Sequence, residues 1–276
     1  RKEDDISLAK KHNLSVEELQ AKMTSSEKIL MKQRDTRIRP GLDDKTLTSW
    51  NGLMLKGYVD AYLTFGEQHF LDIALDNANF ILNKQMRKDG GLNHSYKEGY
   101  STINGYLEDY AFVIDAFLRL YEATFDDKWL NEANALMVYS LEHFYDYESG
   151  MFFFTSDEDP ALIARKMEVN DNVIPASNST MANNLFVLSH HYDRADFNEK
   201  AIQMLNNVIE KVDSYPAGYS NWLNLLINQV YPFYEVAVLG KNATDKPVEL
   251  HSAYIPNKML CGAIKKSTLP LLENRF

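Results

Sequence analysis

The sequence repeats itself at a spacing of 59 residues, and each copy has the pattern of two consecutive helices. Apolar residues recur every three or four positions from about residue 49 to 81, and again from about residue 106 to 140. A repeated helical pair either stacks as a solenoid or closes into a toroid, in which inner helices alternate with outer ones. The matched positions are Tyr62 with Tyr121, Leu71 with Leu130, Ala74 with Ala133, Phe80 with Tyr139, and Gly91 with Gly150.

Further elements extend this pattern along the chain. Ser15 and Glu18 form a capping box that predicts a helix over 15–34. A diverged third pair is expected over 179–192 and 196–212, then a helix over 219–230 and a strand over 235–239. Glycines followed by aromatic and β-branched residues, "GGLNHSY" and "SGMFFFTSD", predict short extended segments on one rim. We therefore expect an all-α fold that is an (α/α) toroid, with a solenoid as the alternative.

Composition excludes several classes of protein. The net charge of −10 and the pI near 5.2 argue against a nucleic-acid partner, which requires a clustered basic face. No apolar run is long enough to predict a membrane span. The seven histidines form no HxxxH or HxH pair, and no glycine-rich phosphate loop occurs, so we expect neither a metal nor a cofactor. The chain begins at Arg1 without an initiator methionine, which indicates a fragment or a processed product.

In a toroid, the loops that precede the inner helices meet at one mouth. Helix N-termini that point at a common pocket favour anionic or hydroxyl-rich ligands. Four loops are expected there, over 37–50, 100–108, 157–178 and 215–222.

The first of these loops reads "RPGLDDKTLTSWNGL" and contains Arg39, Asp43, Asp44, Trp50 and Asn51. A tryptophan beside amide and carboxylate groups suits a sugar ring, because the indole covers the apolar face while polar groups bind the hydroxyls. The alternative is a capping cluster, in which the aspartates bind only helix N–H groups and arginines.

The second loop, "NGYLEDYAF", contains Asn104, Tyr106, Glu108, Asp109 and Tyr110. Adjacent carboxylates on a helix point about 100° apart, so at most one faces the pocket squarely. We expect that one to be Asp109. The alternative is that both carboxylates only complement the helix dipole.

The third loop is long and polar, as functional loops often are. Arg165, Asp171 and Asn178 are its candidate residues, and a plain surface loop is the alternative. The fourth loop could add an aromatic wall around Trp222 or could simply pack into the core. His94 lies on a rim segment, where it could titrate usefully.

Four runs carry a resemblance to a known family: "RDTRIRPGLDDKTLTSWNGLML", "LEDYAFVIDAFLRLYEATFDDKWL", "GMFFFTSDEDPALIARKMEVNDNVIPASNS" and "EVAVLG". From about residue 15 onwards, the chain resembles the C-terminal part of the YyaL and spermatogenesis-associated, thioredoxin-domain-containing proteins. The resemblance implies an α/α toroid similar to N-acylglucosamine 2-epimerases and six-hairpin glycosidases. It also implies that residues 1–276 are one part of that toroid, whose first hairpins, together with a thioredoxin-like domain, precede this chain.

The chain departs from the family pattern at two places. The usual Pro-Ser-Gly-Asn-Ser step reads Pro175-Ala176-Ser177-Asn178-Ser179, which retains Asn178. Epimerases of similar fold often have Asp-His where this chain has Asp109-Tyr110, and tyrosine is a poor base near neutral pH. The epimerase mechanism therefore does not transfer directly.

Three functions follow from these observations. The first is an epimerase or isomerase of reducing sugars, and the second is a two-carboxylate glycosidase. The third is a non-catalytic module that works with the thioredoxin-like domain, which the absence of a histidine base at the mouth favours. A cytoplasmic location is expected because the lone Cys261 permits no internal disulfide. The candidate catalytic residues are Asp43, Asp109 and Asp171; the candidate sugar-binding residues are Arg39, Asp44, Trp50, Asn51, Asn104, Tyr106, Glu108, Tyr110, Arg165 and Asn178.

Overall fold

The structure is a computed structural model that describes residues 3–160 and 163–273. The chain forms two compact units, residues 1–44 and residues 45–276. The smaller unit consists of α1 (Asp5–Lys11) and α2 (Val16–Asp35). The predicted capping box at the start of α2 is confirmed: Ser15 Oγ accepts from the amide of Glu18, and the Glu18 carboxylate accepts from the amide of Ser15.

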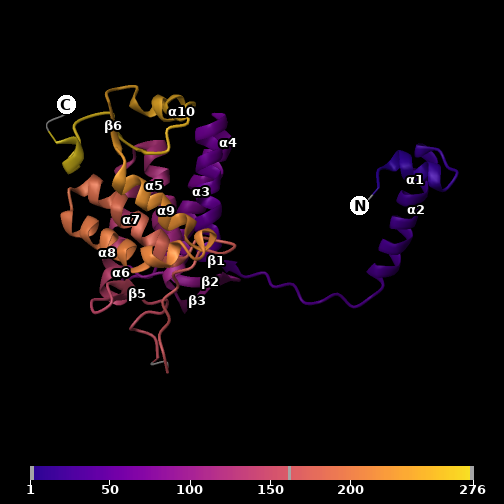
Figure 1. The fold of residues 1–276 in the computed structure, drawn as a ribbon, viewed down its shortest axis with the longest axis horizontal. Helices are drawn as coiled ribbons and strands as arrows, with labels where there is room; N and C mark the ends of the chain where they lie inside the picture. Colours follow the sequence, from indigo (N-terminus) through magenta and orange to yellow (C-terminus); the bar gives the residue numbers. More distant parts are fainter. Residues whose placement is uncertain (1–2, 161–162, 274–276) are drawn as a thin grey trace. The chain divides into compact units, whose positions relative to one another are not determined.

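The larger unit is built from helical hairpins (Figure 1). The first three are α3 (Thr48–Phe65) with α4 (Gln68–Phe80), α5 (Leu107–Thr124) with α6 (Asp127–His143), and α7 (Ser177–Tyr192) with α8 (Ala195–Val212). A π-helical turn, Ile81–Gln85, extends α4, and a 3-10 turn, Pro216–Tyr219, precedes α9 (Ser220–Val230). Helix α5 packs between α3 and α7, and α7 packs against α9. These four are the inner helices, as the sequence predicted.

The 59-residue repeat is visible as contacts between equivalent residues of α3 and α5. Lys56 Nζ lies 2.9 Å from Asp115 Oδ2, and Arg119 Nε lies 2.6 Å from Asp60 Oδ1. Both pairs are separated by 59 residues. The two helices also end alike, because Gly66 and Phe125, again 59 apart, adopt the left-handed conformation at the C-cap. Equivalent positions therefore lie side by side on the inner face.

Short strands lie between the helices, close to the N-terminal ends of α3 and α5. β1 (Thr46–Leu47), β2 (Asn93–Lys97) and β3 (Tyr100–Asn104) form an antiparallel sheet in that order, and β4 (Tyr145–Asp146) pairs with β5 (Met151–Phe152). The predicted extended segments after the glycines are thus confirmed. Strand β2 lies close to the first turn of α5, where the candidate residues Glu108 and Asp109 are.

The C-terminal segment contains the predicted strand and a partner that the sequence did not reveal. β6 (Tyr234–Leu239) pairs in parallel with β7 (Lys258–Ala263), and α10 (Lys246–His251) lies between them in the sequence. Short 3-10 turns, Ala243–Asp245 and Pro270–Leu272, flank these elements. Helix α10 packs against α3 and α5.

The hydrophobic core is centred on α5, which is buried on nearly all sides. Its aromatic residues Phe112, Phe117 and Tyr121 are almost inaccessible to solvent. Apolar residues cover most of its surface, and its charged Asp115, Arg119 and Glu122 are paired, so it is suited to the middle of a layered structure. Across the described ranges, no helix combines the length and the apolarity needed to cross a membrane.

Candidate functional site

The first turn of α5 and strand β2 bring a histidine and a carboxylate together. His94 Nδ1 lies 2.9 Å from Asp109 Oδ2, and this contact raises the pKa of His94. The side chain of His94 is partly exposed, whereas that of Asp109 is fully buried. With the Nδ1–H donated to a carboxylate, the ring is fixed in the tautomer that leaves Nε2 free to accept a proton.

Asp109 is held by the backbone as well as by His94. Its Oδ1 accepts from the amide of Ser49 at 2.8 Å, and its Oδ2 accepts from the amide of Tyr106 at 2.8 Å. Burial raises the pKa of Asp109, and these hydrogen bonds act in the opposite direction. Since both oxygens are used and neither is exposed, the geometry suits a residue that positions His94.

Glu108 lies beside this pair and is half-buried. Ser49 Oγ donates to its carboxylate at 3.3 Å. Burial raises the pKa of Glu108, and the nearby carboxylates of Asp109 and Glu168 raise it further. A carboxyl group whose pKa is raised in this way keeps its proton to a higher pH than an exposed glutamate, as a general acid requires.

Aromatic side chains line the same cluster. The ring of Tyr106 lies 4.8 Å from that of His94 and stacks on Phe154 at 5.1 Å, with an interplanar angle of 15°. An aromatic face next to hydrogen-bonding groups suits a sugar ring. We call His94, Tyr106, Glu108 and Asp109 the mouth cluster.

Asp171 occupies a second buried site, which joins two inner helices. Its Oδ1 accepts from the amide of Ala176 at 2.9 Å and from Ser179 Oγ at 2.7 Å, and its Oδ2 accepts from the amide of Asn221 at 2.8 Å. It therefore ties the N-terminus of α7 to that of α9. Asn178 is equally enclosed: its side chain exchanges two hydrogen bonds with the backbone of Phe152.

The side chains of three other candidates are bound to neighbouring parts of the protein. Asn104 accepts from Arg87 at 2.5 Å and donates to Asp159 at 3.1 Å. Tyr110 is buried, and its hydroxyl accepts from the amide of Leu92 at 2.8 Å. Arg165 donates to the backbone carbonyl of Thr155, and its guanidinium lies 4.2 Å from the Phe153 ring centre.

The candidates of the first loop are divided between the two units. Arg39, Asp43 and Asp44 belong to the smaller unit, where Arg39 donates to Asp35 at 3.0 Å. Trp50 and Asn51 lie on α3 in the larger unit. Trp50 is 65% exposed, whereas the Asn51 amide donates to the carbonyl of Leu47 at 2.7 Å. Trp50 therefore presents most of its side chain to solvent.

The sequence interpretation placed no histidine at the mouth and His94 only on a rim segment, whereas in the structure His94 contacts Asp109 directly. It also overlooked Glu168, which accepts from the amide of Ser177 at 3.0 Å and lies near Glu108. A sequence signal for His94 existed in its alternation with Tyr96, which places both side chains on one face of β2. Nothing in that alternation indicates which helix the strand approaches.

The same residues could offer ligands to a cation. One ligand atom each from His94, Glu108 and Asp109 lie within 4.8 Å of one another, and no other group of this kind occurs among residues 3–160 and 163–273. In the arrangement described here, however, the imidazole and the Asp109 carboxylate are hydrogen-bonded to each other. The expectation of a site without metal stays a prediction.

The fold and its helical hairpins place this chain in the α/α-toroid class. The solved structures it resembles include a GH76 α-mannanase of Bacteroides thetaiotaomicron, with a TM-score of 0.51 and 16% identity over 64% of this chain and 46% of that one. They also include a cellobiose 2-epimerase of Bacillus thermoamylovorans, with a TM-score of 0.51 and 12% identity over 62% of this chain and 46% of that one. At such identities the likeness shows the fold.

Among curated proteins, the chain is 29% identical over 266 residues to human spermatogenesis-associated protein 20, covering 91% of this chain and 34% of that protein. An uncharacterized protein of Caenorhabditis elegans is 31% identical over 219 residues, which is 77% of this chain and 30% of that protein. No family model matches the sequence. The chain is therefore a homologue of part of spermatogenesis-associated protein 20, as the resemblance implied, and it spans about a third of the length of these relatives.

Proposed function

We propose that this chain is a carbohydrate-active α/α toroid whose mouth cluster moves a proton on a reducing sugar. The observation that carries the proposal is the 2.9 Å contact between His94 Nδ1 and Asp109 Oδ2, next to a carboxyl group with a raised pKa. The named activities of two similar folds, sugar epimerisation and mannan cleavage, support a carbohydrate substrate.

In the proposed reaction, the sugar binds in its open-chain form. His94 Nε2 takes the proton from the carbon next to the carbonyl, and the C–H electron pair becomes the C=C bond of an enediol. Glu108, in its protonated form, gives its proton to the carbonyl oxygen. For the epimer, a water molecule gives a proton to the same carbon from the opposite face while Glu108 takes back the O–H proton, and His94 releases its proton to solvent. For the isomer, His94 gives its proton to the neighbouring carbon while Glu108 takes the proton of the other enediol hydroxyl, which becomes the new carbonyl.

The remaining residues near the site do not react with the sugar carbon; they support His94 or contact the sugar ring. Asp109 positions His94 and stabilises the imidazolium that forms. The stacked rings of Tyr106 and Phe154 offer an apolar face to the sugar. Trp50 is exposed at the first turn of α3 and could cover a second sugar face.

Hydrolysis is the second candidate, because a second carboxylate lies near Glu108. Glu168 raises the pKa of Glu108, as expected for two carboxylates that share one site. A glycosidase uses such a pair as acid and as base or nucleophile. In that reaction Glu108 would protonate the leaving oxygen, and His94 would have no required role.

A third proposal is a non-catalytic module that works with the thioredoxin-like domain implied by the resemblance. It predicts sugar binding, or partner binding, without turnover. The expected cytoplasmic location likewise stays a prediction.

The test is proton NMR of the protein in heavy water with mannose and with cellobiose. Loss of the sugar C2 proton signal is expected with the wild-type chain. It should vanish in both Glu108→Gln and His94→Asn, and should persist in Glu199→Gln, which changes an exposed carboxylate on the outer helix α8.

Other outcomes separate the proposals. New reducing ends released from mannobiose, with full activity in His94→Asn, would establish hydrolysis in place of epimerisation. A folded protein that neither exchanges the C2 proton nor releases reducing ends would support the non-catalytic module. Exchange that continues in Glu108→Gln and His94→Asn would remove the mouth cluster from the mechanism.

A further inference from the structure

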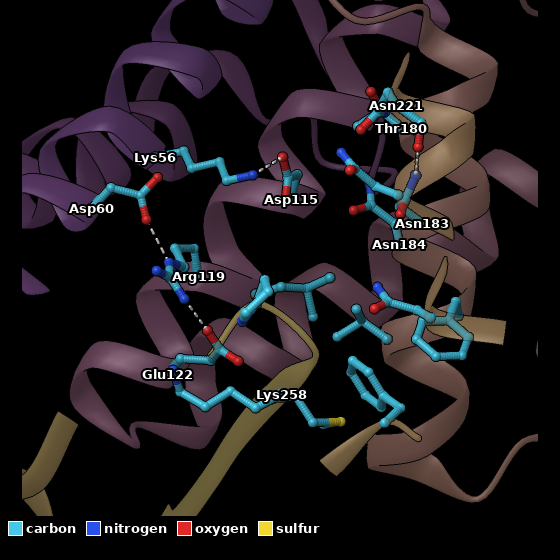
Figure 2. Close-up of a pocket in the computed structure, with 18 residues that line it drawn as sticks. Lys56, Asp60, Asp115, Arg119, Glu122, Thr180, Asn183, Asn184, Asn221 and Lys258 are labelled. Carbon is cyan, nitrogen blue, oxygen red and sulfur yellow. Dashed lines mark hydrogen bonds and ion pairs between the residues drawn. The ribbon is translucent and has the colours of Figure 1, made fainter. Parts of the chain in front are cut away.

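We propose that the larger unit has a second ligand site, which binds a neutral polyhydroxylated molecule on the inner face of the helices. A cavity of about 330 Å³ lies there, lined by residues of α3, α5, α7 and α9 and by the start of β7 (Figure 2). None of the mouth-cluster residues lines it. The site is therefore additional to the proposed catalytic one.

The charged side chains that line this cavity sum to zero, since Lys56, Arg119 and Lys258 accompany Asp60, Asp115 and Glu122, and this favours a neutral ligand. Lys56 pairs with Asp115 at 2.9 Å. Arg119 bridges Asp60 and Glu122, with both contacts at 2.6 Å, and Figure 2 shows this chain of contacts with the Lys56–Asp115 pair as a separate contact. Since Lys56 and Arg119 are already bound to anions, a phosphate or carboxylate ligand would have to displace an existing ion pair to reach them. The third lining cation, Lys258, donates to the backbone carbonyl of Ile255 at 3.2 Å.

Asparagine amides supply the wall opposite the ion pairs. Asn221, Asn224 and Asn228 lie three and four residues apart on α9, so they share one face of that helix. Within the described residues, no side-chain hydrogen bond uses Asn224 or Asn228. An amide both donates and accepts, which matches a hydroxyl group in either direction.

Thr180 provides an independent indication of a missing partner. It lines the cavity and is only 3% exposed, yet its hydroxyl has no hydrogen-bond partner in the structure. A buried hydroxyl without a partner is costly, and the cost is removed when a ligand hydroxyl or a water binds it. Figure 2 shows Thr180 beside Asn221 at the edge of the cavity.

Two phenylalanine rings form another part of the cavity lining. Phe186 and Phe233 both line the cavity, and their rings pack edge-to-face with centroids 4.9 Å apart. Sugars combine hydroxyls at the rim of a ring with apolar C–H faces, so amides together with aromatic rings suit them. A carbohydrate is therefore the class of neutral ligand that this cavity fits best.

The test is isothermal titration of cellobiose and mannose, with mannose 6-phosphate as the charged comparison. It is made in the Glu108→Gln chain, so that turnover at the mouth does not interfere. Adding Thr180→Val, which keeps the side-chain shape, should weaken neutral-sugar binding about fivefold, the usual effect of one hydrogen bond. Asn224→Ala should weaken it similarly, whereas Asn206→Ala, on the exposed face of α8, should leave it unchanged.

Three results would overturn the proposal: no heat from either neutral sugar, equal affinity in the Thr180→Val and Asn224→Ala chains, or tighter binding of mannose 6-phosphate. The readout is binding, so failure of proton exchange at the mouth cluster would leave this result unaffected. Conversely, if C2 proton exchange occurs but Thr180→Val does not change the affinity for neutral sugars, the second site is refuted and the proposed function is not.

Discussion

The backbone amide of Ser49 donates to Asp109 Oδ1 at 2.8 Å, and this bond joins the first turns of the inner helices α3 and α5. The other oxygen of the same carboxylate binds His94 from β2 and the amide of Tyr106. One buried side chain thus fixes two helices and a strand relative to each other. Its removal should affect stability and chemistry together.

Asp109→Asn is expected to lower the free energy of unfolding by about 1–3 kcal/mol. The new side-chain NH₂ group would replace one carboxylate oxygen, so a backbone N–H that donates to that oxygen would lose its acceptor. Proton exchange on the sugar should also be lost, since His94 would no longer be held in one tautomer. Urea denaturation measures the first effect. Asp72→Asn, on the exposed side of α4, is the matched control and should change neither quantity.

Glu108→Gln is expected to stabilise the protein at neutral pH while abolishing exchange. Burial raises the pKa of Glu108 above its value in the unfolded chain. The charged form is therefore disfavoured by folding, and stability is lost as pH rises from the unfolded pKa through the folded pKa. The gain in the variant should disappear below about pH 4, which denaturation curves at several pH values can establish. A variant that is less stable than wild type at pH 7 would contradict this.

His191 is expected to make the fold sensitive to acid. It is buried, both ring nitrogens lack a hydrogen-bond partner, and burial lowers its pKa from 6.5 to about 3. The unfolded state then binds one more proton between these two values. Stability should fall by up to about 1.4 kcal/mol per pH unit as pH drops below 6.5.

His191→Leu should remove this part of the pH dependence. The difference in unfolding free energy between the variant and wild type should therefore be about 2 kcal/mol more favourable to the variant at pH 5 than at pH 8. Thermal denaturation at the two pH values measures the difference. Asn206→Leu, which changes an exposed residue of α8 that carries no ionisable group, should leave the pH dependence as it is. Identical pH curves for wild type and His191→Leu would show that His191 is solvated in solution.

Gly52 is expected to be intolerant of any side chain. A Cβ at this position would lie 2.8 Å from the carbonyl carbon of Phe112 and 3.0 Å from the amide nitrogen of Val113, so α3 and α5 would have to separate. Gly52→Ala should cost about 1–3 kcal/mol. On the same helix, Gly57 has nothing within 4 Å of its Cβ position, and Gly57→Ala should stabilise by about 0.5–1 kcal/mol. Urea denaturation of both variants tests the close packing of the inner helices.

Much of the fold could be predicted because helical periodicity is local. The apolar spacing places α3, α5, α7 and α9 nearly where the structure has them, and the 59-residue repeat predicts that equivalent residues lie side by side. The pairs Lys56–Asp115 and Asp60–Arg119 bear this out. The parallel pairing of β6 with β7 was not predictable, because it joins strands that are separated by α10.

The mouth could be predicted only in part. The sequence marked Tyr106, Glu108 and Asp109 as the start of an inner helix, since charge and aromatic residues cluster there. Whether those side chains face solvent or the protein interior depends on what folds over them. Asp109 is buried because the backbone at Ser49 and the ring of His94 close over it.

The sequence by itself therefore determined the helical hairpins, their repeat and the loops that gather near the inner helices, because these follow from spacing along the chain. Only the tertiary structure decided that His94, and not a residue of the helix itself, meets Asp109, and that Thr180 faces a cavity without a partner. The physical reason is that such contacts depend on the path of the intervening chain. Hydrogen-bond geometry is decided within tenths of an ångström, whereas residue spacing fixes only which face of an element a side chain occupies.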